Sequence, residues 1–261
     1  MKPAPSWSGL EGKSIWLIGG AGHLGAAIAT PLDGLCQKAV CLDLGGRAAN
    51  MVREKGLTRT IPESLDVTAV ARLPGELDRL MERHGVPDGV VHLATASSGG
   101  RRLEDLPAEE FQRTFDLSLT PTFVLCRALA ERMKPRGSGS IVLFSSMYGV
   151  VSPDPRIYEP PQIPNPIDYG AAKAAIVQMT RYLAVHYGPS GLRFNCVTPG
   201  PFPNPNVQKD GNFMQALGRK VPLGRIGQNH EIAGPVFFLL ADGSSYVTGH
   251  SLMVDGGWTA W

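Results

Sequence analysis

Tyr169 and Lys173 are the first residues in this chain whose types and spacing could do chemistry. They lie in Asp168–Tyr187, where small and apolar residues recur at helical spacing. Residues four apart on a helix share one face, one turn apart. A free tyrosine has a pKa of about 10, and a neighbouring lysine ammonium favours the phenolate and lowers that pKa. The spacing therefore predicts a proton-exchanging pair, although a surface Tyr/Lys pair of no function has the same pattern.

A glycine-rich segment from Gly19 to Gly25 is the second candidate site. It follows a predicted strand at Lys13–Ile18 and precedes an alanine-rich helix, which Pro31 is expected to kink or shorten. Glycines in such a turn let the backbone approach a pyrophosphate, whose charge then meets amides at the helix N-terminus. The segment predicts dinucleotide binding.

Asp43 ends the second predicted strand, Lys38–Leu42. A carboxylate at this position accepts hydrogen bonds from the adenosine ribose and repels a 2′-phosphate, which favours NAD over NADP. Arg47, four residues on, could reverse that preference by attracting the phosphate. The alternative is that Asp43 is only a turn residue.

Further segments occur in a fixed order around the tyrosine and lysine. They are Ser140–Ser146 (SIVLFSS), Asn195–Gly200 (NCVTPG), Pro222–Arg225 (PLGR) and Val247–Gly257 (VTGHSLMVDGG). With them the chain resembles the short-chain dehydrogenase/reductase family over nearly its whole length. The resemblance implies that Ser146 polarises the substrate oxygen, Tyr169 exchanges the proton, and Lys173 also holds the nicotinamide ribose.

The same resemblance implies where the cofactor lies. Asp66 and Val67 match the position beside the adenine ring, and the turn at Pro199 and Gly200 faces the nicotinamide. Asn204 is the nearest polar candidate to hold the carboxamide. The full set of expected cofactor residues is Gly19, Gly22, His23, Leu24, Gly25, Asp43, Asp66, Val67, Ala94, Tyr169, Lys173, Pro199, Gly200 and Phe202.

The chain departs from the family pattern at three places. Its glycine spacing is GxxGxxG, with His23 where most single-domain members have glycine. The fourth predicted strand, Gly89–Ala94, leads into His92-Leu93-Ala94-Thr95 in place of NNAG, so only Ala94 matches. Both features resemble the longer sugar-nucleotide epimerase branch. Ser118 stands where the family has an asparagine that orders a water for the lysine, so Ser118 is expected to take part in the proton relay.

Strands and helices alternate along the chain, which predicts an α/β fold with one doubly wound, Rossmann-like parallel sheet. We expect a single domain over residues 1–261. The other predicted helices are Thr68–His84, interrupted near Pro74-Gly75, Pro107–Arg132 and Glu231–Leu240, and the last predicted strands are Arg193–Val197 and Ser251–Val254.

Two segments are expected to shape the substrate site. About residues 150–167 form a proline-rich insertion between Ser146 and Tyr169, which predicts a stiff irregular loop over the catalytic pair. Tyr158 and Glu159 could face a hydroxyl-rich substrate, and Arg101 and Arg102 an anionic one; the alternative is a passive surface loop. About residues 201–222 are expected to form a mobile lid.

Bulk properties exclude several functions. Net charge is +2 and 18% of residues are charged, which gives no basis for nucleic-acid binding. The cysteines form no CxxC and the histidines no metal spacing, so we expect no metal and reduced packing cysteines in a cytoplasmic protein. The start MKPAPSWSG lacks the apolar core of a signal peptide. Ser14–Leu32 is uncharged but too rich in glycine for a membrane span.

These observations predict an NAD(H)-dependent oxidoreductase that interconverts a secondary alcohol and a ketone, with a sugar-like small molecule as substrate. The alternatives are a sugar epimerase or dehydratase that uses bound NAD transiently, and a non-catalytic nucleotide-binding protein. A homotetramer or dimer is expected through Pro107–Arg132 and Asp168–Tyr187, with Trp258 and Trp261 in subunit contacts.

Overall fold

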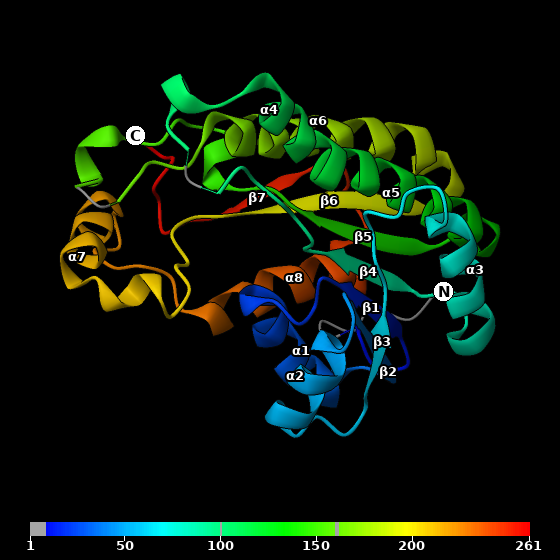
Figure 1. Cartoon of the computed structure of the whole chain (residues 1–261). Helices are drawn as coiled ribbons and strands as arrows, with labels where there is room; N and C mark the ends of the chain where they lie inside the picture. Colours follow the sequence, from blue (N-terminus) through cyan, green and yellow to red (C-terminus); the bar gives the residue numbers. More distant parts are fainter. Residues whose placement is uncertain (1–8, 100, 160–161) are drawn as a thin grey trace.

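A computed structural model describes residues 9–99, 101–159 and 162–261. Its centre is a seven-stranded sheet in the order β3-β2-β1-β4-β5-β6-β7, in which every neighbouring pair is parallel (Figure 1). The strands are β1 (Ser14–Ile18), β2 (Lys38–Asp43), β3 (Thr60–Ser64), β4 (Gly89–His92), β5 (Gly139–Phe144), β6 (Leu192–Pro199) and β7 (Ser251–Val254). The doubly wound α/β fold expected from the alternating sequence is thereby confirmed.

Helices cover both faces of this sheet. In Figure 1, α4, α5 and α6 lie on one side, and α1, α2 and α8 lie on the other. The helices are α1 (His23–Leu35), α2 (Arg47–Lys55), α3 (Leu73–His84), α4 (Ala108–Thr114), α5 (Thr120–Met133), α6 (Ile167–Tyr187), α7 (Gly211–Lys220) and α8 (Ala233–Leu240).

Alternation along the strands divides the apolar core in two. In β1, Trp16 and Ile18 pack with residues of α3, α5 and α6, whereas Ile15 and Leu17 pack with residues of α1 and α8. Successive strand side chains point to opposite faces, so a strand buried on both sides is apolar throughout. This explains why β1, β2 and β5 are largely apolar along their length.

The strand order reverses at β1, which pairs with β2 on one side and with β4 on the other. The connections that leave β1 and β4 therefore run to opposite faces and separate at the carboxyl ends of the strands. Ligands of open parallel sheets bind in the crevice that forms at such a point.

Several predicted boundaries are wrong in detail. The helix expected over Thr68–His84 begins at Leu73, because Pro74 needs no backbone N–H partner in a first turn. Pro31 does not end α1, which continues to Leu35. The segment expected as one helix over Pro107–Arg132 contains a π-helical turn, Phe115–Leu119, between α4 and α5.

Other expectations concern burial. The four cysteines are free and buried, as expected for packing residues. Trp258 is buried against Leu217 and Val221, so its subunit-contact role is wrong: the lid covers it within the chain. Trp261 is exposed. Among the described residues, no helix is long and apolar enough to cross a membrane.

Candidate active site

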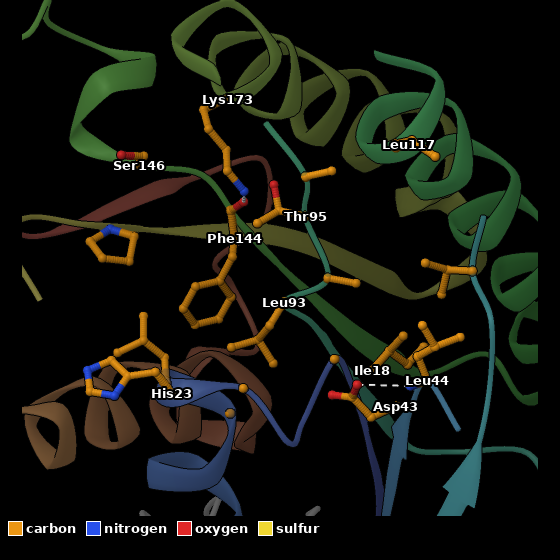
Figure 2. A pocket seen from close by; sticks show the side chains of 18 of the residues that line it. Ile18, His23, Asp43, Leu44, Leu93, Thr95, Leu117, Phe144, Ser146 and Lys173 are labelled. Atoms are coloured by element: carbon orange, nitrogen blue, oxygen red, sulfur yellow. Dashed lines mark hydrogen bonds between the residues drawn. The ribbon is translucent and has the colours of Figure 1, made fainter. Parts of the chain in front are cut away.

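A cavity of about 540 Å³ opens at the carboxyl ends of the strands, beside the reversal of strand order (Figure 2). Most of the residues expected to bind a cofactor or act in catalysis line it. They are Gly19, Gly22, His23, Leu24, Gly25, Asp43, Asp66, Val67, Ala94, Ser146, Tyr169, Lys173, Pro199, Gly200 and Phe202. The fold therefore brings together residues from all parts of the chain.

Tyr169 and Lys173 lie one turn apart on α6, as their spacing predicts. Lys173 is buried, its Nζ donates to the carbonyl of Phe144 at 3.0 Å, and it lies 5.6 Å from the centroid of the Tyr169 ring. Ser146 follows β5 and lines the same cavity. Figure 2 shows Lys173 reaching from its helix toward the ends of the central strands.

Close packing holds α6 against the segment after β5. The hydroxyl of Ser145 donates to the backbone carbonyl of Lys173 at 2.8 Å. A Cβ added at Gly149 would lie 2.7 Å from the backbone carbon of Lys173, so only glycine permits this approach. The relative position of Ser146 and the Tyr/Lys pair is thus fixed by backbone contacts.

Electrostatics at the pair differ from expectation. Burial lowers the pKa of Lys173 to about 8. Burial also raises the pKa of Tyr169, and its hydrogen bond with Ser146 opposes that rise only in part. The expected lowering of the Tyr169 pKa is wrong for the protein alone, because burial disfavours the phenolate and raises that pKa.

Ser118 is buried, but its hydroxyl is already engaged. It accepts from the amide of Ala96 at 2.8 Å and donates to the carbonyl of Ala96 at 3.0 Å. Ser118 therefore ties the π-helical turn to the segment after β4. It lines a small cavity beside Lys173 and does not line the cavity of about 540 Å³ that contains Ser146 and Tyr169.

The glycine turn fits a pyrophosphate. Gly19 has a φ of +77°, and an added Cβ would lie 2.6 Å from the amide nitrogen of Ala94. Gly22 caps α1 without any side-chain hydrogen bond at this helix start. His23 lines the cavity, and its Nε2 is buried with no partner among the described residues. Amides at a helix start and a free polar atom suit a phosphate group.

The Asp43 carboxylate is buried and held by the backbone around it. Its Oδ2 accepts from the amide of Ala21 at 2.9 Å, and its Oδ1 accepts from the amide of Leu44 at 2.8 Å, the dashed line in Figure 2. Arg47 lies 3.4 Å from Oδ1 and is largely exposed. The carboxylate thus lines the cavity in a fixed orientation.

The opposite end of the cavity is formed by Pro199, Gly200 and Phe202. Gly200 must be glycine, because an added Cβ would lie 2.5 Å from the Cα of Asp255. Asn204 does not line the cavity; it is exposed, and its side chain accepts from the amides of the next turn. The expectation that Asn204 holds the carboxamide finds no support in this geometry.

The cavity is also lined by residues that the sequence did not identify as part of the site. Examples are Leu93, Thr95 and Phe144, which follow or end β4 and β5 (Figure 2). Their position at the end of a predicted strand was the signal that could have identified them, because ligands lie at those ends.

The described part of the insertion packs against the lid. Asp154 forms an ion pair with Lys220, and the Tyr158 and Phe213 rings lie 5.2 Å apart. The Tyr158 hydroxyl also lies 2.6 Å from that of Tyr148. The irregular loop is as expected within these residues, apart from the short 3₁₀ turn Pro155–Ile157; Pro160 and Pro161 lie outside them.

The insertion does not line the cavity that holds Ser146 and Tyr169. It lines a second one, of about 890 Å³, together with Arg101 and Arg102. Arg101 is paired with Glu110 through two hydrogen bonds, which offsets its charge. The insertion therefore lies beside the catalytic pair, where Val151, Ile157 and Tyr169 pack against the same buried cluster.

A parallel sheet with a glycine turn at its strand reversal, and a Ser-Tyr-Lys set at the same edge, defines a dinucleotide-binding oxidoreductase. Comparison with known proteins agrees. The family model described as enoyl-(acyl carrier protein) reductase matches residues 20–259. The chain belongs to the short-chain dehydrogenase/reductase family and is an NAD(P)-dependent oxidoreductase.

Individual relatives match over nearly their whole length. A 2,5-dichloro-2,5-cyclohexadiene-1,4-diol dehydrogenase of Sphingobium indicum is 30% identical, covering 97% of this chain and 99% of that protein. A D-threitol dehydrogenase of Mycolicibacterium smegmatis is 29% identical, covering 96% and 94%. The crystal structure of a short chain dehydrogenase from Leptospira borgpetersenii with bound NAD+ has a TM-score of 0.83 at 30% identity, covering 99% and 98%.

Proposed function

We propose that this protein oxidises a secondary hydroxyl of a small polyol or sugar-like molecule to a ketone with NAD, and catalyses the reverse reduction. The observation that carries the proposal is that Ser146, Tyr169 and Lys173 line one cavity with the glycine turn and Asp43. Nicotinamide, when bound, supplies the hydride acceptor or donor. The residues of this chain supply binding, orientation and proton exchange.

Each of the three side chains has a separate task in this proposal. The Ser146 hydroxyl holds the substrate oxygen, and the Tyr169 oxygen takes the alcohol proton during oxidation and returns it during reduction. Lys173 stays anchored to the carbonyl of Phe144, so it presents a fixed cation beside Tyr169 and a donor toward the nicotinamide ribose. That cation stabilises the phenolate when bound ligands fill the cavity.

The substrate class rests on the relatives. Two of them are named for a cyclohexadiene diol and for D-threitol, both of which carry more than one hydroxyl. A panel of polyols, deoxysugars, ketoses and simple ketones, assayed for net change in NADH or NADPH, tests the proposal. Turnover of simple ketones alone, with none of the polyols, would refute the substrate class.

The finer choice of NAD over NADP rests on Asp43. Its carboxylate is fixed by the amides of Ala21 and Leu44 and lines the cavity at the end of β2. In this proposal the adenosine ribose lies beside it. A carboxylate held there accepts from ribose hydroxyls and repels a 2′-phosphate. Arg47 is paired with this carboxylate at 3.4 Å, so the positive charge of Arg47 is already partly offset.

Replacing Asp43 with alanine should weaken NADH binding by about tenfold, which corresponds to the loss of one hydrogen-bonded charge. It should also reduce the ratio of the affinity for NADH to the affinity for NADPH. Fluorescence titration of both cofactors measures this. Asp66→Ala, which removes an exposed carboxylate on the same cavity, is the matched control and should leave the ratio unchanged. Tighter NADPH than NADH binding by the unmodified protein would show that Arg47 dominates.

The insertion is proposed to support the substrate side through the lid. Replacing 154–164 with a short glycine-serine turn removes the contacts of Asp154 and Tyr158 with the lid helix α7. We expect kcat/KM for the substrate to fall by about tenfold or more, because the lid loses an ion pair and ring packing, with NADH affinity preserved. Ser152→Ala, at an exposed residue just before the replaced segment, is the control. Unchanged kinetics in the loop replacement would make the insertion passive.

We also propose that the protein is a homo-oligomer, that it is cytoplasmic and that it forms one domain. Exposed Phe123 on α5, with Tyr182 and Val185 on α6, supports a homo-oligomer, a tetramer or a dimer, built on these helices. Free buried cysteines suit a reducing cytoplasm. We propose that residues 1–261 act as one domain, since a single sheet runs from Ser14 to Val254.

A further inference from the structure

Asp168 is a buried titratable residue that the proposed reaction leaves without a task. It lies in the first turn of α6, directly before Tyr169, and its exposed fraction is 0%. Burying a carboxylate costs free energy unless the carboxylate is hydrogen-bonded. Within the described residues, its side-chain partners are Ser98 and Thr114, and neither of them carries a charge. The carboxylate is therefore held by neutral donors alone.

The contacts of this carboxylate join three segments of the chain. Its Oδ2 accepts from the backbone amide of Ser98 at 2.9 Å and from the hydroxyl of Thr114, and its Oδ1 accepts from the hydroxyl of Ser98 at 2.8 Å. Ser98 follows β4, and Thr114 ends α4. Burial alone would raise the pKa of Asp168, but the hydrogen bonds outweigh burial and lower that pKa below its ordinary value. The carboxylate is thus ionised at neutral pH, in a first helical turn that favours negative charge.

Residues 94–98, here called the wall segment, include three that line the catalytic cavity together with Tyr169. Ser118 holds this segment through one backbone amide and one backbone carbonyl. Asp168 holds it a second time, through the amide of Ser98. Because Asp168 and Tyr169 are neighbours in the chain, the second contact joins the wall of the cavity to the helical turn that carries the phenol.

We propose that Asp168 is a positioning residue, which fixes the wall segment relative to Tyr169. It acts on the reaction through these two partners and touches neither substrate nor cofactor, since it is fully buried and is not among the residues that line the cavity. The inference rests on the proposed proton exchange by Tyr169. The contact itself, however, can be measured without any activity.

Amide hydrogen exchange followed by NMR is the first test. In the unmodified protein the Ser98 amide should exchange at least about tenfold more slowly than in Asp168→Ala, because its acceptor is a buried carboxylate. Equal exchange in the two proteins would overturn the inference and leave the proposed function intact. A protected Ser98 amide without turnover of any substrate would instead refute the proposed function, and with it the catalytic meaning of the contact.

Kinetics of variants test the positioning role. Asp168→Ala should lower kcat by about tenfold to a hundredfold, because a small displacement of a catalytic group is costly. The affinity for NADH should stay nearly unchanged, since the glycine turn and Asp43 keep their own contacts. Asp168→Asn should retain most of kcat: its oxygen accepts from the Ser98 amide, and its NH₂ group donates to the Ser98 hydroxyl, which then serves as acceptor. Equal losses of kcat in the two variants would contradict the role.

Asp33→Ala is the matched control for loss of stability alone. Asp33 accepts from the amides of Thr58, Arg59 and Thr60, and it is not among the residues that line the catalytic cavity. This variant should melt at a lower temperature and keep its kcat. An equal fall of kcat in Asp33→Ala, at a temperature where both variants are folded, would reduce Asp168 to a structural residue.

A second pair of variants applies if Asp168→Ala fails to fold. Thr114→Val removes one hydroxyl from the carboxylate with little change of shape, whereas Thr114→Ser keeps that hydroxyl. We expect kcat to fall in the valine variant by about threefold or more and to be retained in the serine variant. Retention of full kcat by both would contradict the positioning role.

Discussion

Tyr169→Phe should abolish turnover while leaving the fold and NADH affinity nearly unchanged. The substitution removes one oxygen atom from Tyr169. The ring packs against a buried cluster of Met147, Tyr148, Leu217, Val221 and Trp258, so its ring contacts survive. The lost oxygen is the one group in the proposal that exchanges a proton with the substrate. General acid-base catalysis contributes on the order of a hundredfold to ten-thousandfold, and no other phenol lines the catalytic cavity within the described residues.

Steady-state rates at saturating cofactor measure this effect, and fluorescence titration of NADH measures the retained binding. Tyr148→Phe is the matched control, because it removes the hydroxyl of a nearby buried tyrosine that contacts Tyr158 instead. That variant should keep most of its activity. Retention of about a tenth of the original rate by Tyr169→Phe would show that another group exchanges the proton.

Lys173→Ala should lose turnover and also weaken cofactor binding, which separates it from the tyrosine variant. Burial lowers the pKa of Lys173 to about 8, so its ammonium form is favoured below that pH and is lost as the pH rises through it. The alanine variant loses both the cation beside the phenol and the donor to the ribose. We expect kcat to fall by about a thousandfold and NADH affinity by about tenfold.

Lys209→Ala, an exposed lysine on the lid segment, is the control for loss of positive charge alone. It should bind NADH normally. A Lys173→Ala variant with full NADH affinity and lost turnover would confine the lysine to the proton step. A Lys173→Ala variant with normal turnover would show that Lys173 has no part in catalysis.

The sequence predicts the architecture well because both faces of the sheet are buried at its centre, which makes β1, β2, β4 and β5 largely apolar runs. It also predicts most cofactor residues, since the glycine turn and Asp43 follow the first two strands directly. Contacts between distant segments are less accessible. Nothing local to residues 154–164 indicates that Asp154 pairs with Lys220, and so the insertion appeared to cover the catalytic pair.

Electrostatics are the least predictable part of the site. The spacing of Tyr169 and Lys173 indicates attraction between lysine and phenolate, but not the burial that raises the pKa of Tyr169 and lowers that of Lys173. Ser118 likewise matched a family position, yet its hydroxyl is taken by the backbone of Ala96. His92 departs from the family motif, and nothing in the sequence indicates its contact with Thr122.

Transfer of deuterium from a polyol labelled at the carbinol carbon is the most direct test of the proposed chemistry. Incubated with NAD and the labelled polyol, the protein should form deuterated NADH and the ketone in equal amounts, as mass spectrometry can measure. Tyr169→Phe should form neither. Return of the deuterium to an isomerised product with no net NADH would identify an epimerase or dehydratase, and no transfer with any polyol, despite tight NADH binding, would contradict an enzymatic role on this class of substrate.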